Sequence, residues 1–414
     1  MTTKITSANL DNLPNLVDWQ AVKTSAFTAE SGKGYFVNTT SSAITVTLPS
    51  SPSLGDTIAI VDYATTFATN NVTLNPNGNK IEAGTANGTL STNDQTHTLV
   101  YTDSTQGWKI VNQDTASGIQ AAYVAATGGT VATSGDYKIH TFNSSSNFVV
   151  SDAGNAQGSN KVSYLIVAGG GGGGGSLSGT NGGAGGGGAG GFREGKSPDG
   201  GYTASPSVGP DGITLSVQTY PITVGAGGSG TSGNRGTTGS NSTFSTITSA
   251  GGGGGGSRGP DSSSGDGKNG GSGGGGGHGS ASSGSAGVGN NPPTSPAQGS
   301  NGRAYPAPGG GGGGGAGQAG QPAPSTSPGG NGQPTSITGS AVTYAGGGAG
   351  SHGGGAGTGG SGGGGNANAS GGTGTAGTAN TGGGGGSSGE GGPGTTTGAA
   401  GGSGVVIIRY KYQN

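Results

Sequence analysis

Solid runs of glycine constrain the fold of this chain more than any other feature. Residues 169–175 and 251–256 are unbroken glycine, and only 13 of the 107 glycines precede residue 169. An α-helix is disfavoured by roughly 1 kcal/mol per glycine, a glycine sheet has no side chains to pack, and collagen needs filled positions between its glycines. The remaining regular structure is an extended threefold helix of the polyproline II type, here polyglycine II.

The surroundings of the glycine runs favour an ordered bundle over a solvated linker. Strand-like segments at 162–167, 220–224, 244–248 and 341–344 lead into glycine, and the apolar segment 404–410 closes the chain. Without Cβ atoms, extended glycine helices can approach closely and exchange hydrogen bonds worth about 1 kcal/mol each. Those bonds must offset the large conformational entropy that glycine loses on folding. We therefore expect a glycine-rich polyglycine II domain over residues 169–414, with loop insertions and a closing strand.

The segment before the glycine-rich domain divides into three parts. Residues 1–25 are predicted to be a leader for attachment or oligomerisation, in which Leu10, Leu13, Leu16 and Val17 form one face of a short helix limited by Pro14. Residues 26–115 are predicted to form a β-sandwich or β-prism, because short strands at 44–48, 57–61, 97–101 and 107–111 alternate with turns. Residues 116–168 are a second β region, with strands at 137–142, 148–150 and 162–167.

Composition narrows the class of protein. Hydrophobic residues make up 27% of the chain and charged residues 8%, so the side chains cannot fill one large core. The net charge of −2 without a basic stripe argues against nucleic acid as a partner. Neither an 18-residue apolar run nor a secretory signal is present, so we expect cytoplasmic synthesis without membrane insertion. The absence of cysteine excludes disulfides and thiol chemistry.

The sequence contains fragments of phosphate-binding and metal-binding motifs, but the residues around each fragment argue against such a site. Residues 190–197 match the phosphate-binding pattern G-x-x-x-x-G-K-[ST], but Pro198 and the glycines after it will not begin the helix that such a loop requires. The four histidines are scattered and lack zinc-site spacing. Residues 261–269 carry oxygen ligands without the calcium-loop pattern. We predict no enzyme activity, catalytic residue, cofactor or metal.

Three motifs in order carry a resemblance to a known family. The segments 164–171 (YLIVAGGG), 220–227 (YPITVGAG) and 404–410 (GVVIIRY) resemble the glycine-rich domain of tail fibres from tailed bacteriophages. Residues 26–115 resemble a β module of tail-fibre proteins, although this region departs from the known glycine-rich adhesins. The resemblance implies a fibre or fibre-tip subunit of the virion, homotrimeric and joined to other tail proteins. It also implies a bacterial surface receptor, either a polysaccharide or an outer-membrane protein.

Receptor contacts are expected in the insertions between glycine runs, because binding residues concentrate on loops held by a rigid scaffold. The insertions are 192–211, 257–269, 288–308 and 318–338. Aromatic and arginine side chains are the usual anchors of an interface. The candidate receptor-binding residues are Phe192, Arg193, Tyr202, Arg258, Lys268, Arg303 and Tyr305.

Other functions stay open at this stage. A structural fibre or virion decoration protein would have the same scaffold without receptor binding. An ice-binding bundle would favour regular repeats and a flat face, which the irregular insertions oppose. A tailspike glycosidase would need paired carboxylates, and the chain has 17 acidic residues in all.

Overall fold

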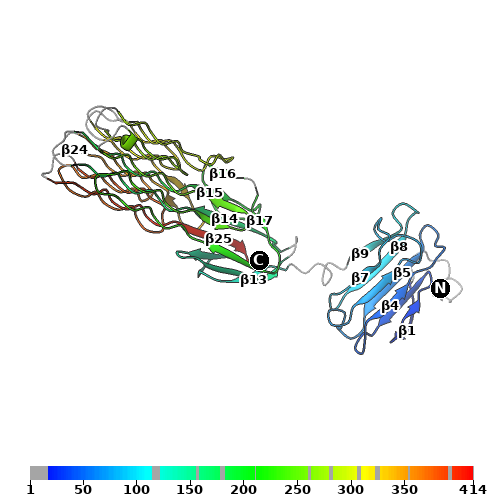
Figure 1. Cartoon of the computed structure of the whole chain (residues 1–414). Helices are drawn as coiled ribbons and strands as arrows, with labels where there is room; N and C mark the ends of the chain where they lie inside the picture. The colour runs from blue at the N-terminus through cyan, green and yellow to red at the C-terminus, as the bar shows by residue number, and fades with distance from the viewer. Residues whose placement is uncertain are drawn as a thin grey trace, which may run out of the picture. The chain divides into compact units, whose positions relative to one another are not determined.

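The computed structural model is all-β and divides into two compact units, Met1–Ala121 and Ala122–Asn414. It describes residues 17–113, 122–154, 158–177, 182–209, 211–259, 263–278, 283–304, 309–321, 327–352, 355–389 and 394–413. Each unit is considered by itself (Figure 1). Of the residues predicted to form the short helix face, Leu10, Leu13 and Leu16 lie outside the described residues and only Val17 lies within them.

The first unit is a β-sandwich. One sheet has the order β1-β3-β5-β8-β9 and the other β2-β4-β6-β7, and the first six strands alternate between the two sheets. Apolar side chains from both sheets, including Ile60, Leu99, Val46 and Leu74, share one core. The strands are β1 (Asp18–Lys23), β2 (Phe27–Thr28), β3 (Lys33–Val37), β4 (Ile44–Thr47), β5 (Thr57–Asp62), β6 (Val72–Asn75), β7 (Gly88–Leu90), β8 (Thr96–Tyr101) and β9 (Trp108–Gln113).

The predicted leader reaches too far along the chain. Residues 18–23 form β1, which pairs with β3 in parallel and so belongs to the sandwich. The β-branched pattern that marks the other strands is weak here, since β1 is an edge strand with mostly exposed side chains. Edge strands carry less of the apolar alternation on which strand prediction depends.

The second unit begins with a sandwich of two sheets. One has the order β10-β13-β18-β19-β20 and the other β11-β12-β25-β14-β15-β16, with β17 also paired to β14. The strands are β10 (Val124–Thr127), β11 (Thr130–Ser134), β12 (Tyr137–Phe142), β13 (Ser146–Ala153), β14 (Lys161–Val167), β15 (Phe192–Gly195), β16 (Val208–Gly209), β17 (Ile213–Thr214), β18 (Thr219–Thr223), β19 (Ser242–Phe244), β20 (Ile247–Ser249) and β25 (Val405–Lys411).

Strands β14 and β25 lie at the centre of the larger sheet and are buried on both faces. On one face, side chains such as Ile166 and Ile408 meet the smaller sheet. On the other, Leu165 and Ile407 pack against a second core that contains Ile337 and Tyr344. Burial on both faces explains why these two strands are continuous apolar runs. The second β region and the glycine-rich domain therefore share one sheet through β12, β14 and β25.

The predicted strand at 244–248 is instead a hairpin. Phe244 ends β19, Ile247 begins β20, and Ser245 between them has φ 54°. Serine tolerates this turn, and the apolar residues on both sides made the segment look continuous. The remaining elements are η1 (Ser263–Gly265), β21 (Gln333–Thr335), β22 (Val342–Tyr344), β23 (Ser351–His352) and β24 (Gly355–Ala356).

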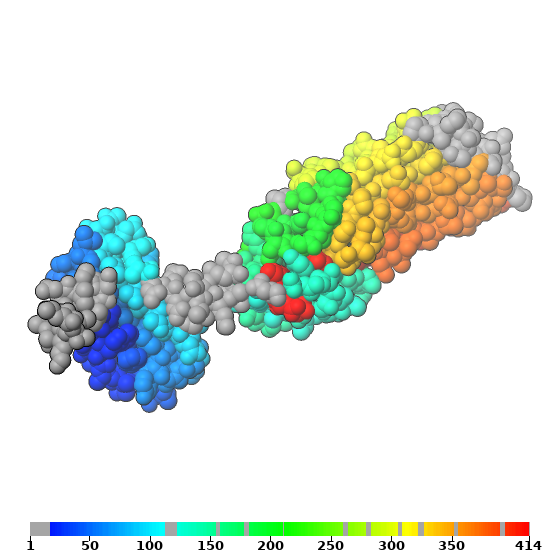
Figure 2. All heavy atoms as spheres, turned by 180° about the vertical axis from the view of Figure 1, so that it is seen from behind, coloured from blue at the N-terminus to red at the C-terminus, as the bar shows by residue number. Residues whose placement is uncertain are grey.

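The glycine runs form a bundle of extended rods that leave the sandwich side by side (Figures 1 and 2). The rod of residues 168–177 shows their helical symmetry in its hydrogen bonds. Gly169, Gly172 and Gly175 donate to residues 240, 237 and 234 of one antiparallel neighbour. Gly170 and Gly173 donate to residues 402 and 399 of a second neighbour, and Gly171 and Gly174 to residues 188 and 185 of a third.

This change of partner every three residues is the symmetry of polyglycine II, with three residues per turn. None of the glycines at 169–175 has a positive φ. Their carbonyl groups accept bonds from three further rods, at residues 252 and 255, at 228, and at 385 and 388. Each buried rod can thus have six neighbours, and its backbone groups are satisfied without side chains.

Close contact between rods explains why their interior is glycine. A Cβ atom on Gly171 or Gly174 would overlap the carbonyl oxygen of Gly253 or Gly256 in the adjacent rod. Rods at the periphery follow a different rule with the same period. In residues 225–230, Gly225 and Gly228 are buried whereas Ala226 and Ser229 are exposed. Side chains therefore occur where the threefold helix turns a residue outward.

Candidate functional site

The first predicted insertion, 192–211, is part of the folded sandwich rather than a free loop. Phe192–Gly195 form β15 and pair with β14, and Val208–Gly209 form β16. The Phe192 ring is 2% exposed and packs in the second core. Phe192 is therefore a buried packing residue and not the exposed anchor that was predicted, since an apolar ring in this register fills the space between the sheet and the rods.

A buried arginine ties the same segment to the closing strand. In β25, Arg409 is 3% exposed and donates from Nε to the carbonyl oxygen of Gly200 at 3.0 Å. Its other nitrogens donate to the carbonyl oxygens of Gly201 at 3.3 Å and Ile337 at 3.2 Å. The guanidinium lies 4.3 Å from the ring centre of Tyr137. These bonds satisfy a cation that burial would otherwise penalise.

Tyr202 lies beside this arginine. Its ring packs against the second core, and burial raises the pKa of its hydroxyl, as does the nearby charge of Glu194. The Lys196 ammonium and the Arg409 guanidinium lie 5.4 and 5.7 Å from the Tyr202 ring centre. Contrary to the prediction, Tyr202 contributes to the packing of this segment instead of presenting an exposed ring.

The bundle holds three more of the predicted residues. Arg258 is 9% exposed, and its backbone N–H donates to the carbonyl oxygen of Gly175 in the central rod. Lys268 is half-buried. Burial lowers the pKa of its ammonium group, and the positive charge of Arg235 lowers it further. Arg303 is exposed. Tyr305 lies outside the described residues, so its predicted role is untested.

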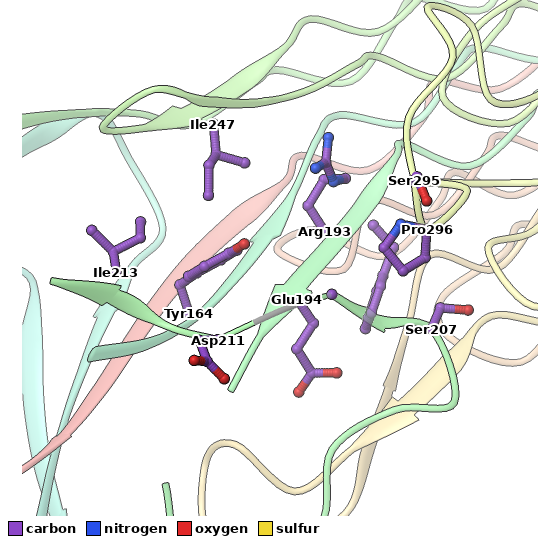
Figure 3. A pocket seen from close by; sticks show the side chains of 11 residues that line it. Tyr164, Arg193, Glu194, Ser207, Asp211, Ile213, Ile247, Ser295 and Pro296 are labelled. Carbon is purple, nitrogen blue, oxygen red and sulfur yellow. The ribbon is translucent and has the colours of Figure 1, made fainter. Parts of the chain in front are cut away.

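Arg193 lines a pocket of about 270 Å³ between the larger sheet and a neighbouring loop (Figure 3). Next to Glu194 on β15, Arg193 projects to the opposite side of the strand, as the alternation of a β-strand requires. The pocket has an apolar side and a polar side. Its lining consists of Tyr164, Phe192, Arg193, Glu194, Ser207, Gly209, Asp211, Ile213, Ile247, Ser295 and Pro296.

The three charged residues of the pocket differ in how they are bound. The Glu194 oxygens accept hydrogen bonds from Ser205 N at 2.8 Å and Thr335 Oγ1 at 2.6 Å. The Asp211 carboxylate lies 3.3 Å from Lys161 Nζ and is largely exposed. Among the described residues, Arg193 has no hydrogen bond or ion pair from its guanidinium, so its donors remain available to a molecule in the pocket.

The pocket can bind a small polar molecule with one apolar face. Arginine supplies a planar set of donors for carboxylate or hydroxyl oxygens, and the aliphatic side chains of Ile213 and Ile247 can cover the other face. The sequence identified Arg193 but missed Tyr164, Ser295 and Asp211. In the sequence, Tyr164 has the pattern of a residue in a core strand. No pattern in the neighbouring sequence indicates that residues 207, 247 and 295 line the same pocket.

No group of three or more His, Asp or Glu side chains in the described part of the chain could hold a metal ion. In the same residues, no helix is long and apolar enough to cross a membrane. The segment 190–197, which matches a phosphate-binding pattern, joins a glycine rod to β15 and is followed by a turn at Pro198–Gly200. No helix N-terminus is present there to bind phosphate.

These features define an all-β protein in which the rods of a polyglycine II bundle are continuous with the strands of a β-sandwich. A model of the glycine-rich domain family matches residues 144–411, more than half of the chain, and the protein belongs to that family. The match spans β14, every rod and β25, and so includes the two β segments that enclose the bundle. No curated protein shows significant similarity to the chain.

Proposed function

We propose that this protein is a subunit of a bacteriophage tail fibre or fibre tip that recognises a bacterial surface receptor without catalysis. The observation that carries this proposal is the Arg193 pocket, held between a sheet buried on both faces and a bundle whose rods are hydrogen-bonded to their neighbours. A binding site needs such a support, because positions that shift by an ångström lose directional contacts. The resemblance of three segments to tail-fibre proteins supplies the biological setting.

The pocket favours a polysaccharide receptor over a protein receptor. A sugar ring has apolar C–H faces and a rim of hydroxyl oxygens, which match the isoleucine side and the Arg193 side of the pocket. A protein partner would normally need an interface of about 1,200–2,000 Å² with exposed anchors. The aromatic anchors predicted for such an interface, Phe192 and Tyr202, are packed into the core instead.

Binding to host cells tests the proposal directly. Purified protein should bind a susceptible bacterial strain, and Arg193→Gln should reduce that binding by about tenfold, equal to about 1.4 kcal/mol. Lys23→Gln, at a cation of the first unit that is not among the candidate receptor contacts, is the matched control. Equal binding by wild type and Arg193→Gln would reject the pocket as the receptor site.

Assembly into a homotrimer on the virion, in contact with other tail proteins, is part of the same proposal. Analytical ultracentrifugation of the full chain should give three times the monomer mass. Immunolabelling of purified particles should place the protein on the tail. A monomer absent from particles would contradict this part of the proposal.

A structural fibre or decoration protein is the second candidate function. It is favoured by the burial of Phe192 and Arg258 and the partial burial of Tyr202, three residues first assigned to receptor contact. In that case the protein would be present in virions, but the purified protein would not bind host cells and its removal would not change the range of hosts.

A further inference from the structure

Five N–H groups on rods of the bundle donate to a side-chain oxygen of the next rod. Such N–H groups occur where a rod has no sixth neighbour to accept them. An asparagine or aspartate oxygen takes the place of the missing carbonyl. The pairs are Asn241 Oδ1 with Gly251 N at 2.9 Å, Asp266 Oδ1 with Ser285 N at 2.7 Å, Asn269 Oδ1 with Val288 N at 2.8 Å, Asn301 Oδ1 with Gly289 N at 2.9 Å, and Asn366 Oδ1 with Gly359 N at 2.8 Å.

Gly254 departs from this pattern. In its rod, residues 251, 254 and 257 share one face, because the helix repeats every three residues. The N–H of Gly251 donates to Asn241 Oδ1, and the N–H of Ser257 donates to the carbonyl oxygen of Ser264 at 2.8 Å. Within the described ranges, no acceptor receives the N–H of Gly254, although Gly254 is buried. Buried N–H groups are rarely left without a partner.

Two cationic residues flank this N–H. On one side, residues 235, 238 and 241 share the face of their rod that carries Asn241, so Arg235 and Thr238 lie on the same side as the side chain that bonds to Gly251. On the other side, the N–H of Lys268 donates to the carbonyl oxygen of Gly254 at 2.9 Å, which fixes Lys268 at the same level. The register that sets Asn241 opposite Gly251 sets Thr238 opposite Gly254 and Arg235 one turn further, opposite Ser257. We call the space over Gly254, between the two rods that carry Arg235 and Lys268, the groove over Gly254.

The two cationic side chains beside the groove have no acidic partner among the described residues. Burial is the main cause that lowers the pKa of the Lys268 ammonium group. The positive charge of Arg235 is the second cause. The Nε atom of Arg235 is buried and has no hydrogen-bond partner in the described structure. The ion pairs formed by the described residues do not include Arg235 or Lys268. The Gly254 N–H and the Nε atom of Arg235 are thus two buried donors without an acceptor among the described residues.

We propose that the groove over Gly254 is an oxyanion-binding site formed by the Gly254 N–H, Arg235 and Lys268. The bound group is a carboxylate or a phosphate, because both offer several oxygen acceptors to donors on different sides. Hydrogen bonds between charged partners are short and strong, and arginine can bind either group through two nitrogens. An anion here would supply the acceptor that an asparagine or aspartate supplies to the five N–H groups above.

This site lies on the side of the bundle and is distinct from the Arg193 pocket. It would give the protein a second contact with an acidic surface polymer, and that biological use rests on the proposed function. Two weak contacts on one rigid body raise the total affinity for a polymer through effective concentration. The binding of a small anion, in contrast, depends only on the groove.

Titration with inorganic phosphate and with glucuronate tests the site in the full-length protein. The amide resonance of Gly254 should shift and saturate in a ¹H–¹⁵N spectrum as either anion is added. The double variant Arg235→Gln/Lys268→Gln should weaken binding by at least about tenfold, which corresponds to about one lost charged hydrogen bond. Arg303→Gln, an exposed cation outside the groove, should bind as wild type does.

The outcomes separate the site from the proposed function. A shift that does not saturate, or that is equal in wild type and the double variant, overturns the oxyanion site. Saturation by only one of the two anions identifies which group the groove selects. If the groove binds anions but the protein fails to bind any host cell, the oxyanion site is supported and the proposal of receptor recognition is rejected. The thermal unfolding profile of the double variant in the absence of anions shows whether it is folded.

Discussion

The Nε2 atom of His140 lies 2.9 Å from the hydroxyl oxygen of Tyr410, although the two residues are 270 positions apart. The other ring nitrogen, Nδ1, lies 2.7 Å from the carbonyl oxygen of Gly128. His140 belongs to β12 and Tyr410 to β25, which pair in the larger sheet. The contact joins the beginning of the second unit to the last strand of the chain and closes the bundle between them.

The stability of this unit should fall in mild acid. Burial lowers the pKa of His140 from its ordinary value of 6.5, so the unfolded chain takes up a proton before the folded chain does. The stabilisation is complete above about pH 6.5 and is lost as the pH falls below it, by at most about 1.4 kcal/mol per pH unit for one group. Calorimetry between pH 7.5 and 5 measures this slope, which His140→Gln should reduce. An unchanged slope in that variant would exclude His140 as its source.

Substitution of Gly174 by alanine should destabilise the bundle strongly. The new methyl group would overlap the carbonyl oxygen of Gly256 in the next rod, and two hydrogen-bonded backbones cannot separate without losing their bonds. Overpacking of this kind costs about 1–3 kcal/mol or more. Ala376→Ser adds one atom at an exposed position of the bundle and should change stability by less than about 0.5 kcal/mol. Similar melting temperatures for the two variants would contradict close rod packing.

Deletion of β25 should unfold the second unit and spare the first. The strand pairs with β12 on one side and β14 on the other, and its side chains enter both cores. Both tryptophans, Trp19 and Trp108, belong to the first unit. Tryptophan fluorescence should therefore report a normal unfolding transition in a chain that ends at residue 404, while limited proteolysis removes residues beyond 121. Protection of the glycine rods in that chain would show that they fold without the closing strand.

Replacement of Arg409 by methionine should cost about 3 kcal/mol. The carbonyl groups of Gly200, Gly201 and Ile337 would lose their donors, and unsatisfied buried groups cost about 1–3 kcal/mol each, partly recovered by relaxation. Arg303→Met at an exposed position should be nearly neutral. Chemical denaturation of the two variants gives the comparison. A loss below about 0.5 kcal/mol for Arg409→Met would mean that these bonds do not hold the 192–211 segment against β25.

Several strands of the fold could be predicted because their own residues form an apolar run or alternate between apolar and polar. The apolar runs at 162–167 and 404–410 correspond to β14 and β25, and the alternation at 44–48 corresponds to β4. The edge strand β1 was missed, since an edge contributes little to a core. For the candidate site, the sequence indicated Arg193 but gave no sign that Tyr164 and Ser295 would line the same pocket.

The sequence by itself indicated that the solid glycine runs, such as 169–175 and 251–256, would be polyglycine II, because unbroken glycine has no other regular structure that satisfies its backbone. It also determined that side chains would be absent where rods meet. Only the tertiary structure decided which rods are neighbours, since glycine runs are chemically alike and do not specify a partner. It likewise decided that Phe192 is buried, that Tyr202 packs against the second core, and that the charge of Arg235 acts on Lys268. Those placements arise from contacts between residues far apart in the chain, which no local pattern encodes.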